Sequence, residues 1–367
     1  MSELYIGVMS GTSMDGIDIA LCEIDDIKCS LLASAEYPFD KGLETEILEV
    51  INGSTTLEQI GTIDNKLGTI FGDAINSFIK KESLDADTIT AIGLHGQTLW
   101  HAPDAKHPFS MQLGCPNVVS AKTGIQVVAD FRRMDIANGG QGAPFAPAFH
   151  QEVFKHMNKK TAVLNIGGMA NLTVLGEELR GVSSLVEGWD TGCGNVLMDY
   201  WSMNDSDIGY DKDAKFALRG EVKEELLNSF LKDEYFSKLP PKSTGREYFN
   251  PTWLANHLPL FDTIKAEDIQ RTLLELTAKS IAIDANNTKS ELLIVCGGGA
   301  KNPLLMQRLK ELCNAEVKVS NEFGVSSEYM EAMAFAWLAY KRVHREVVKL
   351  SSVTGSTKDS ILGGIYG

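Results

Sequence analysis

The stretch Tyr5–Ala20, YIGVMSGTSMDGIDIA, decides the fold class of this chain. An apolar run enters a loop rich in hydroxyl, glycine and acidic residues, and a second apolar run follows directly. Two short apolar runs joined by a Gly-containing polar loop predict a β-hairpin. Backbone N–H groups in such a loop form an anion-binding nest, and Asp15 and Asp18 are candidate ligands for a metal ion or its waters. The loop is a candidate phosphate grip, with an ordinary hairpin turn as the alternative.

This loop differs from two well-known phosphate-binding loops. The P-loop pattern G-x-x-x-x-G-K-[ST] is absent from the sequence. The dinucleotide fingerprint G-x-G-x-x-G joins a strand directly to a helix, whereas this loop connects two predicted strands. A different nucleotide-binding architecture is therefore indicated.

Composition sets the broad class. The chain has 367 residues, 44% hydrophobic and 23% charged, as in ordinary globular proteins, and its length favours two domains. The net charge of −15 and the pI near 5.0 argue against nucleic acid or an anionic membrane as a general partner. No stretch approaches the about 20 apolar residues of a membrane span, and the N-terminus lacks a signal-peptide pattern. We expect a cytoplasmic protein.

The six cysteines show no C-x-x-C pair and no zinc-binding spacing. Most lie in or beside apolar runs, which favours buried free thiols. Cys193 is the one cysteine inside a Gly-rich loop, and no basic residue adjoins it to lower its pKa.

Apolar patterns place the regular elements of the first half. Leu57 to Phe78 carries apolar residues at three- and four-residue spacing, which predicts an amphipathic helix. The predicted strands span residues 4–9, 17–24, 29–37, 90–94 and 125–129.

The second half repeats the plan of the first. Again a strand enters a Gly-rich polar tip, here Gly167–Asn171, and a second strand leaves it. We expect two similar α/β domains facing each other, with a ligand cleft between them. Residues 237–246 (SKLPPKSTGR) predict an exposed loop. The expected strands span 161–166, 172–175, 291–296 and 316–320, with one more ending near Asp190, and the expected helices span 195–203, 267–286, 303–313 and 328–345.

Seven motifs occur in order along nearly the whole chain: GVMSGTSMDGID (7–18), GLHGQT (93–98), ADFRRMDIANGGQGAP (129–144), NIGGMANLT (165–173), GWDTGCGN (188–195), CGGGAKNP (296–303) and EAMAFAWLA (331–339). Together they resemble the anhydro-N-acetylmuramic acid kinase family. The resemblance implies two actin-like (ribonuclease H-like) domains with an active-site cleft between them, residues 1–130 plus 346–367 and residues 131–345. It also implies ATP and Mg²⁺ as cofactors, with the metal ligands unassigned, and a homodimer.

The family converts 1,6-anhydro-N-acetylmuramic acid, ATP and water into N-acetylmuramate 6-phosphate and ADP, in peptidoglycan recycling. Such phosphoryl transfer depends mainly on positioning and charge neutralisation. The resemblance implies two phosphate loops and an adenosine-side turn. The implied ATP-binding residues are Gly11, Thr12, Ser13, Met14, Asp15, Gly16, Ile17, Asp18, Gly167, Gly168, Asn171, Gly297, Gly298, Gly299 and Asn302.

Asp190 is the catalytic candidate. It matches the family's catalytic aspartate, which implies a general base that deprotonates a water attacking the anomeric carbon. The residue types alone equally allow a helix N-cap, where Asp is favoured. Asn302 and Pro303 likewise fit a plain helix start.

The sugar and its lactyl carboxylate need polar partners, which two motifs supply. An Arg fork suits a carboxylate, although two adjacent arginines in an acidic protein are often surface charge. A glutamate at a helix start favours the helix dipole, and the family places one near the sugar. The candidate substrate residues are His95, Gln97, Thr98, Arg132, Asp135 and Glu331.

Two alternatives remain open from the sequence. One is a kinase of the same fold that acts on another sugar, and the other is an ATP-dependent switch protein. Because the two phosphate loops lie in different domains and serve one nucleotide, we expect domain closure. A kinase needs its acceptor to consume ATP, whereas a switch hydrolyses ATP slowly without one.

Overall fold

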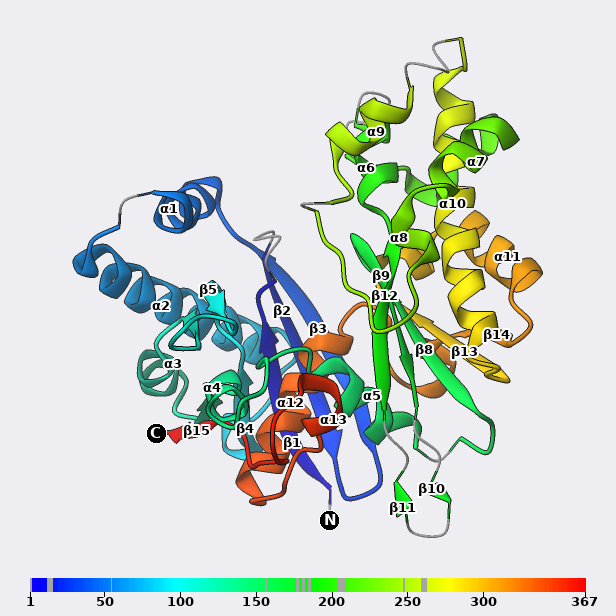
Figure 1. Ribbon diagram of the computed structural model, residues 1–367. Helices are drawn as coiled ribbons and strands as arrows, with labels where there is room; N and C mark the ends of the chain where they lie inside the picture. The colour runs from blue at the N-terminus through cyan, green and yellow to red at the C-terminus, as the bar shows by residue number, and fades with distance from the viewer. Residues whose placement is uncertain are drawn as a thin grey trace. The chain divides into compact units, whose positions relative to one another are not determined.

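The computed structural model describes residues 2–11, 16–53, 55–155, 157–175, 178–179, 182–183, 186–203, 209–246, 248–258 and 263–367. The chain forms two compact α/β units (Figure 1). Unit 1 comprises Met1–Val153 and Tyr329–Gly367, and unit 2 comprises Phe154–Glu328. The domains expected from the sequence divide the chain differently, because they place residues 131–153 and 329–345 in the second domain. Among the described helices, none has the length and apolar character to cross a membrane.

Unit 1 is built on a six-stranded mixed sheet with the order β15-β7-β4-β1-β2-β3. β1, β2 and β3 form an antiparallel meander, while β4 lies parallel to β1 and β7 parallel to β4. The predicted N-terminal hairpin is confirmed. The strands are β1 (Glu3–Met9), β2 (Gly16–Ile24), β3 (Cys29–Pro38), β4 (Ile89–Leu94), β7 (Val127–Ala129) and β15 (Gly364–Tyr366), with a separate hairpin of β5 (Gln97–Ala102) and β6 (Phe109–Leu113).

Helices cover both faces of this sheet. The predicted amphipathic helix is α2 (Leu57–Lys81), which begins with a capping box between Thr56 and Gln59. Its apolar side packs with the side chains of Ile6 and Val8 in one core. The other helices of unit 1 are η1 (Ala86–Thr88), α1 (Lys41–Asn52), α3 (Pro116–Thr123), α4 (Arg132–Ala137), α5 (Ala146–Phe154), α12 (Met330–Val343) and α13 (Ser351–Thr354), of which α5 ends one residue inside unit 2.

Helix α12 lies against the opposite face of β1 and β4 at very short range. Strand residues alternate between faces, so Gly7 faces α12 while its neighbours Ile6 and Val8 face α2. A Cβ atom on Gly7 would lie 1.8 Å from the backbone oxygen of Ala332, and one on Gly93 would lie 2.0 Å from that of Phe335. These two glycines therefore set the distance between the helix and the sheet.

Unit 2 repeats the strand arrangement of unit 1. Its five-stranded sheet has the order β12-β9-β8-β13-β14, with β8, β9 and β12 antiparallel and β13 and β14 parallel to β8. Both sheets therefore share the order 3-2-1-4-5, the ribonuclease H-like topology expected for this chain. The strands are β8 (Thr161–Ile166), β9 (Met169–Val174), β12 (Glu187–Cys193), β13 (Leu292–Cys296) and β14 (Glu316–Val319), with a small hairpin of β10 (Glu178–Leu179) and β11 (Val182–Ser183).

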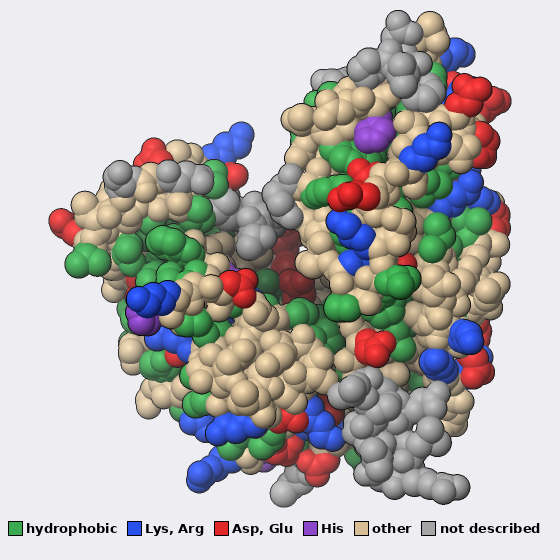
Figure 2. Space-filling model, in the orientation of Figure 1, with side chains coloured by type: hydrophobic (Ala, Val, Ile, Leu, Met, Phe, Trp, Pro, Cys, Tyr) green, Lys and Arg blue, Asp and Glu red, His purple; other side chains and the backbone are tan. Residues whose placement is uncertain are grey.

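The helices and the sheet of unit 2 enclose one apolar core, and the long helix α10 contributes many of its residues. On the surface, acidic and basic side chains are interspersed over the face drawn in Figure 2. The helices are α6 (Val196–Ser202), α7 (Glu224–Leu231), α8 (Glu234–Ser237), α9 (Pro251–His257), α10 (Ala266–Asn287) and α11 (Pro303–Leu312), with the short turns η2 (Lys212–Ala214), η3 (Ala217–Arg219), η5 (Gly298–Lys301) and η6 (Ser320–Phe323).

Most predicted elements agree with the structure to within one or two residues, but three differences matter. The strand expected at 172–175 begins at Met169, because the turn before it is only two residues long. The strand expected to end near Asp190 continues to Cys193. The β5–β6 hairpin, along with helices α1, α3, α4 and α5, has no counterpart among the predicted elements.

We expect Gly7→Ala to lower the free energy of unfolding by about 2–3 kcal/mol, because the added methyl group collides with the α12 backbone. The matched control is Gly61→Ala within α2, where a Cβ atom would have no heavy atom within 4 Å. This control should raise stability by about 0.5–1 kcal/mol. Urea unfolding of both variants measures the difference, and equal stability of the two would contradict the close packing of α12.

Candidate functional site

Asp190 lies on β12, at one edge of the described sheet of unit 2. It is aligned with Asn171 on β9, which is aligned in turn with Asn165 on β8. Aligned residues on neighbouring strands share a face, so a carboxylate and two amides form a polar row across three strands. A register shift follows Asp190, and α6 begins later with Asn195 at its N-cap. The structure therefore rules out the helix-cap alternative for Asp190.

The segment that follows α8 holds Asp190 in place. The Asp190 N–H donates to the carbonyl of Lys242 at 3.0 Å. The Ser243 hydroxyl and the Thr244 N–H donate to Asp190 Oδ2 at 3.1 and 3.0 Å. The Tyr235 hydroxyl donates to the Asp190 carbonyl at 2.9 Å. Main chain and side chain of the catalytic candidate are thus both fixed.

The prediction of an exposed loop over residues 237–246 is wrong at Lys242, whose side chain is buried and only 8% exposed. Its ion-pair partner, Asp284, lies on α10, so no local sequence pattern indicates that Lys242 is buried. Sequence reasoning also missed Ser243 and Thr244 as contacts of the catalytic candidate. Their hydroxyl-rich sequence signalled only a turn.

Gly167 and Gly168 form the turn between β8 and β9, where a phosphate loop is predicted. The N–H of Gly194 donates to the carbonyl of Gly168 at 2.9 Å, and the N–H of Asn195 donates to that of Gly167 at 2.8 Å. The Gly167 N–H itself donates to the carbonyl of Met169. This turn and the one after β12 are therefore locked together, and a phosphate here would need donors other than the Gly167 N–H.

The glycine turn after β13 adjoins the same row of side chains. Gly297 has φ +82°, and a Cβ atom there would lie 2.3 Å from Asn165 Oδ1, so the position favours glycine. Gly298 and Gly299 begin η5. Asn302 caps α11, its Oδ1 accepting a backbone N–H at 3.0 Å, which confirms the helix-start interpretation and leaves nucleotide contact as a prediction.

A pocket of about 640 Å³ lies beside this turn. Burial raises the pKa of Asp199 in its lining to about 6, an effect that Arg246 opposes. The pocket is open to a polar ligand of substantial size. Its lining residues are Asn195, Met198, Asp199, Gly209, Tyr210, Asp211, Lys212, Asp213, Gln270, Gly298, Lys301 and Asn302.

In unit 1, the predicted first phosphate loop is only partly described. Gly11 follows β1, while Gly16, Ile17 and Asp18 begin β2. Thr12, Ser13, Met14 and Asp15 lie outside the described residues.

Gln97 holds the beginning of this loop. Its Nε2 donates to the carbonyl of Gly11 at 3.2 Å, and its Oε1 lies 2.6 Å from the donor Ser10 Oγ. The side chain is 1% exposed. The GLHGQT motif therefore packs against the loop, while a contact of Gln97 with substrate stays a prediction.

His95 and Arg132 come together from two predicted motifs. Arg132 Nη2 lies 2.8 Å from His95 Nε2, and Arg132 Nη1 donates to the carbonyl of Gly142 at 2.8 Å. Burial lowers the pKa of His95 to about 3 and that of Arg132 to about 10, the latter opposed by the charge of Glu331. A neutral imidazole therefore accepts from a charged guanidinium.

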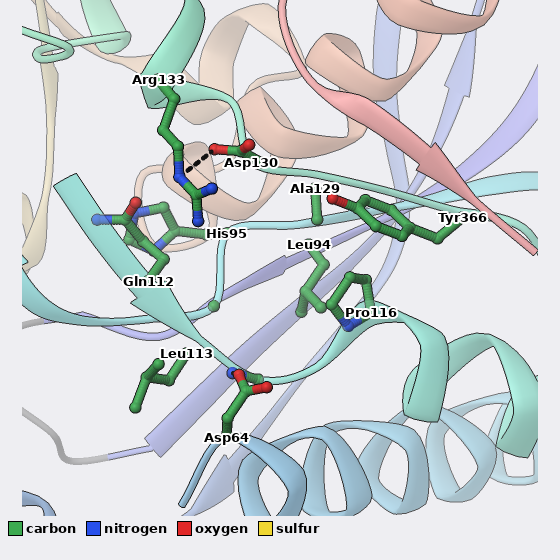
Figure 3. A pocket seen from close by; sticks show the side chains of 12 residues that line it. Asp64, Leu94, His95, Gln112, Leu113, Pro116, Ala129, Asp130, Arg133 and Tyr366 are labelled. Carbon is green, nitrogen blue, oxygen red and sulfur yellow. Dashed lines mark hydrogen bonds and ion pairs between the residues drawn. The ribbon is translucent and has the colours of Figure 1, made fainter. Parts of the chain in front are cut away.

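Figure 3 shows a pocket of about 160 Å³ in unit 1, lined by residues of both motifs. Arg133 extends toward Asp130 and forms an ion pair with it at 3.2 Å. Asp130 has φ +61°, unusual for a residue other than glycine, and such strain often occurs at functional sites. Arg133 is the more exposed of the two adjacent arginines, and the set of candidate substrate residues omitted it.

The remaining substrate candidates occupy different settings. Asp135 is buried, and its oxygens accept from the Gly142 N–H at 2.7 Å and the Thr354 hydroxyl at 2.8 Å. Thr98 lies on β5 and accepts from the Gln112 side chain. Glu331 lies in the first turn of α12. Asp135 thus has a clear structural role, and contact of these three residues with substrate remains a prediction.

Metal ligands and thiols are the remaining groups to place. Within them, no group of three or more His, Cys, Asp or Glu side chains is placed to hold a metal ion. The cysteines are free, and most are buried, as predicted. Burial raises the pKa of Cys193 to about 12, so its thiol stays protonated near neutral pH.

Comparisons with known proteins agree over the whole chain. A family model described as anhydro-N-acetylmuramic acid kinase matches residues 3–367. A protein of that name from Sulfurimonas denitrificans is 55% identical and matches over 100% of both chains. Another, from Vibrio vulnificus (strain YJ016), is 49% identical over 99% of this chain and 98% of its own.

Solved structures of low identity also match. The activator of the 2-hydroxyisocaproyl-CoA dehydratase from Clostridium difficile, with bound ADPNP, has a TM-score of 0.46 at 13% identity, covering 94% of this chain and 96% of that one. A ROK family glucokinase from Streptomyces griseus, in complex with glucose and AMPPNP, has a TM-score of 0.40 at 13% identity, covering 92% and 99%.

We expect unit 1 to lose stability as the pH falls. Burial lowers the pKa of His95 and of His150 to about 3, whereas an unfolded His has a pKa of about 6.5. The unfolded chain therefore binds more protons below about pH 6.5, and each His should cost about 1.2 kcal/mol between about pH 7.0 and pH 5.5. Urea unfolding at both pH values gives the free energy of unfolding, which should fall less between them in His150→Phe than in the wild type. An equal fall in both proteins would refute this assignment.

Proposed function

This chain belongs to the anhydro-N-acetylmuramic acid kinase family, and we propose that Asp190 is the general base of its reaction. The enzyme is a kinase that uses ATP and a sugar hydroxyl as acceptor, opening the 1,6-anhydro ring of 1,6-anhydro-N-acetylmuramic acid hydrolytically to give N-acetylmuramate 6-phosphate and ADP. One observation carries the assignment of the base. A carboxylate fixed by Ser243 and Thr244 lies in one polar row with Asn171 and Asn165.

In this mechanism Asp190 takes a proton from water as the water oxygen bonds to the anomeric carbon. The bond between that carbon and O6 breaks, and O6 bonds to the γ-phosphorus as the bond to ADP breaks. The two hydrogen bonds to Oδ2 favour the ionised carboxylate and orient it for proton transfer. A base at this position needs no covalent intermediate.

The pocket beside the Gly297 turn supports adenosine binding in unit 2. It joins the glycine turn, the cap of α11 and α6 in one cavity large enough for a nucleoside. Of the ATP-binding residues expected from the sequence, Gly298 and Asn302 line this pocket. Mg²⁺ usually binds one or two carboxylates together with phosphate oxygens and waters. Asp18, at the phosphate-loop end of β2, suits such a role as one carboxylate.

Unit 1 supplies the polar groups for the sugar in this proposal. The neutral His95 and the charged, half-buried Arg132 form one pair, and Glu331 acts electrostatically on Arg132. We place the lactyl carboxylate near Arg132 and Arg133, because a guanidinium fork matches a carboxylate. The family resemblance further supports a cytoplasmic location and a homodimer, and light scattering in solution would test the dimer.

An assay of ATP consumption separates the proposed reaction from the two alternatives. It compares 1,6-anhydro-N-acetylmuramic acid with glucose, N-acetylglucosamine and N-acetylmuramic acid, and determines the product mass in ¹⁸O-water. We expect phosphorylation of the anhydro sugar alone, with solvent oxygen at the anomeric carbon. Phosphorylation of another sugar would favour the second kinase hypothesis, and slow ATP hydrolysis indifferent to sugar would favour a switch protein.

We expect Asp190→Asn to lower kcat by at least about 100-fold, because an amide cannot take the proton from water. ATP binding and the melting temperature should stay close to wild type, since the amide fits the same space. Coupled ADP release measures kcat, and isothermal titration calorimetry measures ATP binding. The control is Glu234→Gln on α8, an exposed acid whose neutralisation should leave kcat unchanged. Near-normal turnover of Asp190→Asn would remove it as the base.

A further inference from the structure

A buried ion pair involves Lys242, whose carbonyl accepts the N–H of Asp190. Lys242 Nζ is 3.0 Å from Asp284 Oδ2, and the two side chains are only 3% and 7% exposed. The Trp189 indole N–H donates to the same oxygen at 3.0 Å. The Lys242 ammonium also lies 5.3 Å from the centre of the Tyr235 ring. Four side chains from three elements and one loop thus meet around a single buried charge pair.

Stability alone does not explain such a pair. Taking two charges out of water costs free energy that their attraction often fails to recover, so buried ion pairs are weak evidence for a stabilising role. The same segment carries Lys238, which pairs with Glu234 at the surface, where its charge is solvated. We therefore ask which neighbouring groups the buried Lys242 holds in place.

Lys242 is bound at both ends. Its ammonium is held by Asp284 of α10, and its carbonyl accepts the N–H of Asp190. The next two residues, Ser243 and Thr244, supply the two donors to Asp190 Oδ2. Because these donors follow Lys242 directly in the chain, any shift of Lys242 moves both of them relative to the carboxylate.

We propose that Lys242 and Asp284 are positioning residues, which tether residues 242–244 to α10 and thereby fix the orientation and ionisation of the Asp190 carboxylate. This inference rests on the proposed role of Asp190 as general base. Among the described residues, the charged and titratable groups that these contacts link to the segment around Asp190 are Lys242 from the loop, Asp284 from α10 and Tyr235 from α8. Releasing the tether weakens two hydrogen bonds that favour the ionised form.

The test is the double variant Lys242→Met/Asp284→Asn, which removes both charges and keeps an acceptor for Trp189. We expect kcat to fall about 10- to 100-fold, as a misplaced catalytic group predicts, with the KM for ATP unchanged. In a plot of kcat against pH, the fall on the acidic side should move to higher pH. Hydrogen exchange should show faster exchange at the amides of Asp190 and Thr244, while the strands of unit 1 keep their protection.

Two further variants complete the design. Lys238→Met removes an exposed lysine from the same segment and should leave kcat and the pH profile at wild-type values. Lys242→Gln/Asp284→Asn also removes both charges but keeps two hydrogen-bonding side chains, and it takes the place of the first double variant if that variant fails to fold. It should reproduce the fall in kcat and the shift to higher pH in smaller measure.

The outcomes separate this inference from the assignment of the base. Wild-type kcat and pH profile, in a variant whose residues 242–244 exchange rapidly, would overturn the positioning role. Unchanged exchange at Thr244 would overturn the tether itself. If instead Asp190→Asn is active, the base assignment fails, whereas the exchange measurement still reports on the tether.

Discussion

Strand register is the constraint on which the site of unit 2 depends. Asp190, Asn171 and Asn165 share one face only because β12, β9 and β8 pair in a single register. A slip of one strand by one residue would turn its polar side chain to the other face. The turn of Gly167 locked to Gly194 prevents such a slip near the Asp190 carboxylate. Rigid backbone, rather than long side chains, therefore determines where the proposed base lies.

The two units use one topology for different tasks. In unit 2 the order 3-2-1-4-5 brings Asn171 and the Gly297 turn to the two strands on either side of Asn165, with Asp190 one strand beyond Asn171. In unit 1 the same order places His95 directly after β4, where Arg132 meets it from α4. In our proposal one copy of the fold holds the base and the nucleoside while the other holds the sugar. The shared scaffold supplies positions, and the loops supply the chemistry.

Local patterns in the sequence were sufficient for the two hairpins with Gly-rich tips, for the strands after them and for the long helices, because apolar period and glycine placement are local signals. The resemblance to a family supplied Asp190, which residue types alone left equal to a helix cap. Lys242 was unpredictable, since its burial depends on Asp284 from a distant helix. The grouping of α12 with unit 1 was missed for the same reason: it rests on Gly7 and Gly93, hundreds of residues earlier in the chain.

The position of α12 also determines the order in which the two units can be completed during synthesis. Unit 2 is inserted between the two segments of unit 1, so α12 leaves the ribosome only after Phe154–Glu328 has been made. Until then, the face of β1 and β4 that α12 covers stays bare, although the strands themselves were synthesised first. The inserted unit, continuous in sequence, is able to fold meanwhile. The half of the enzyme that begins the chain is thus the half that is finished last.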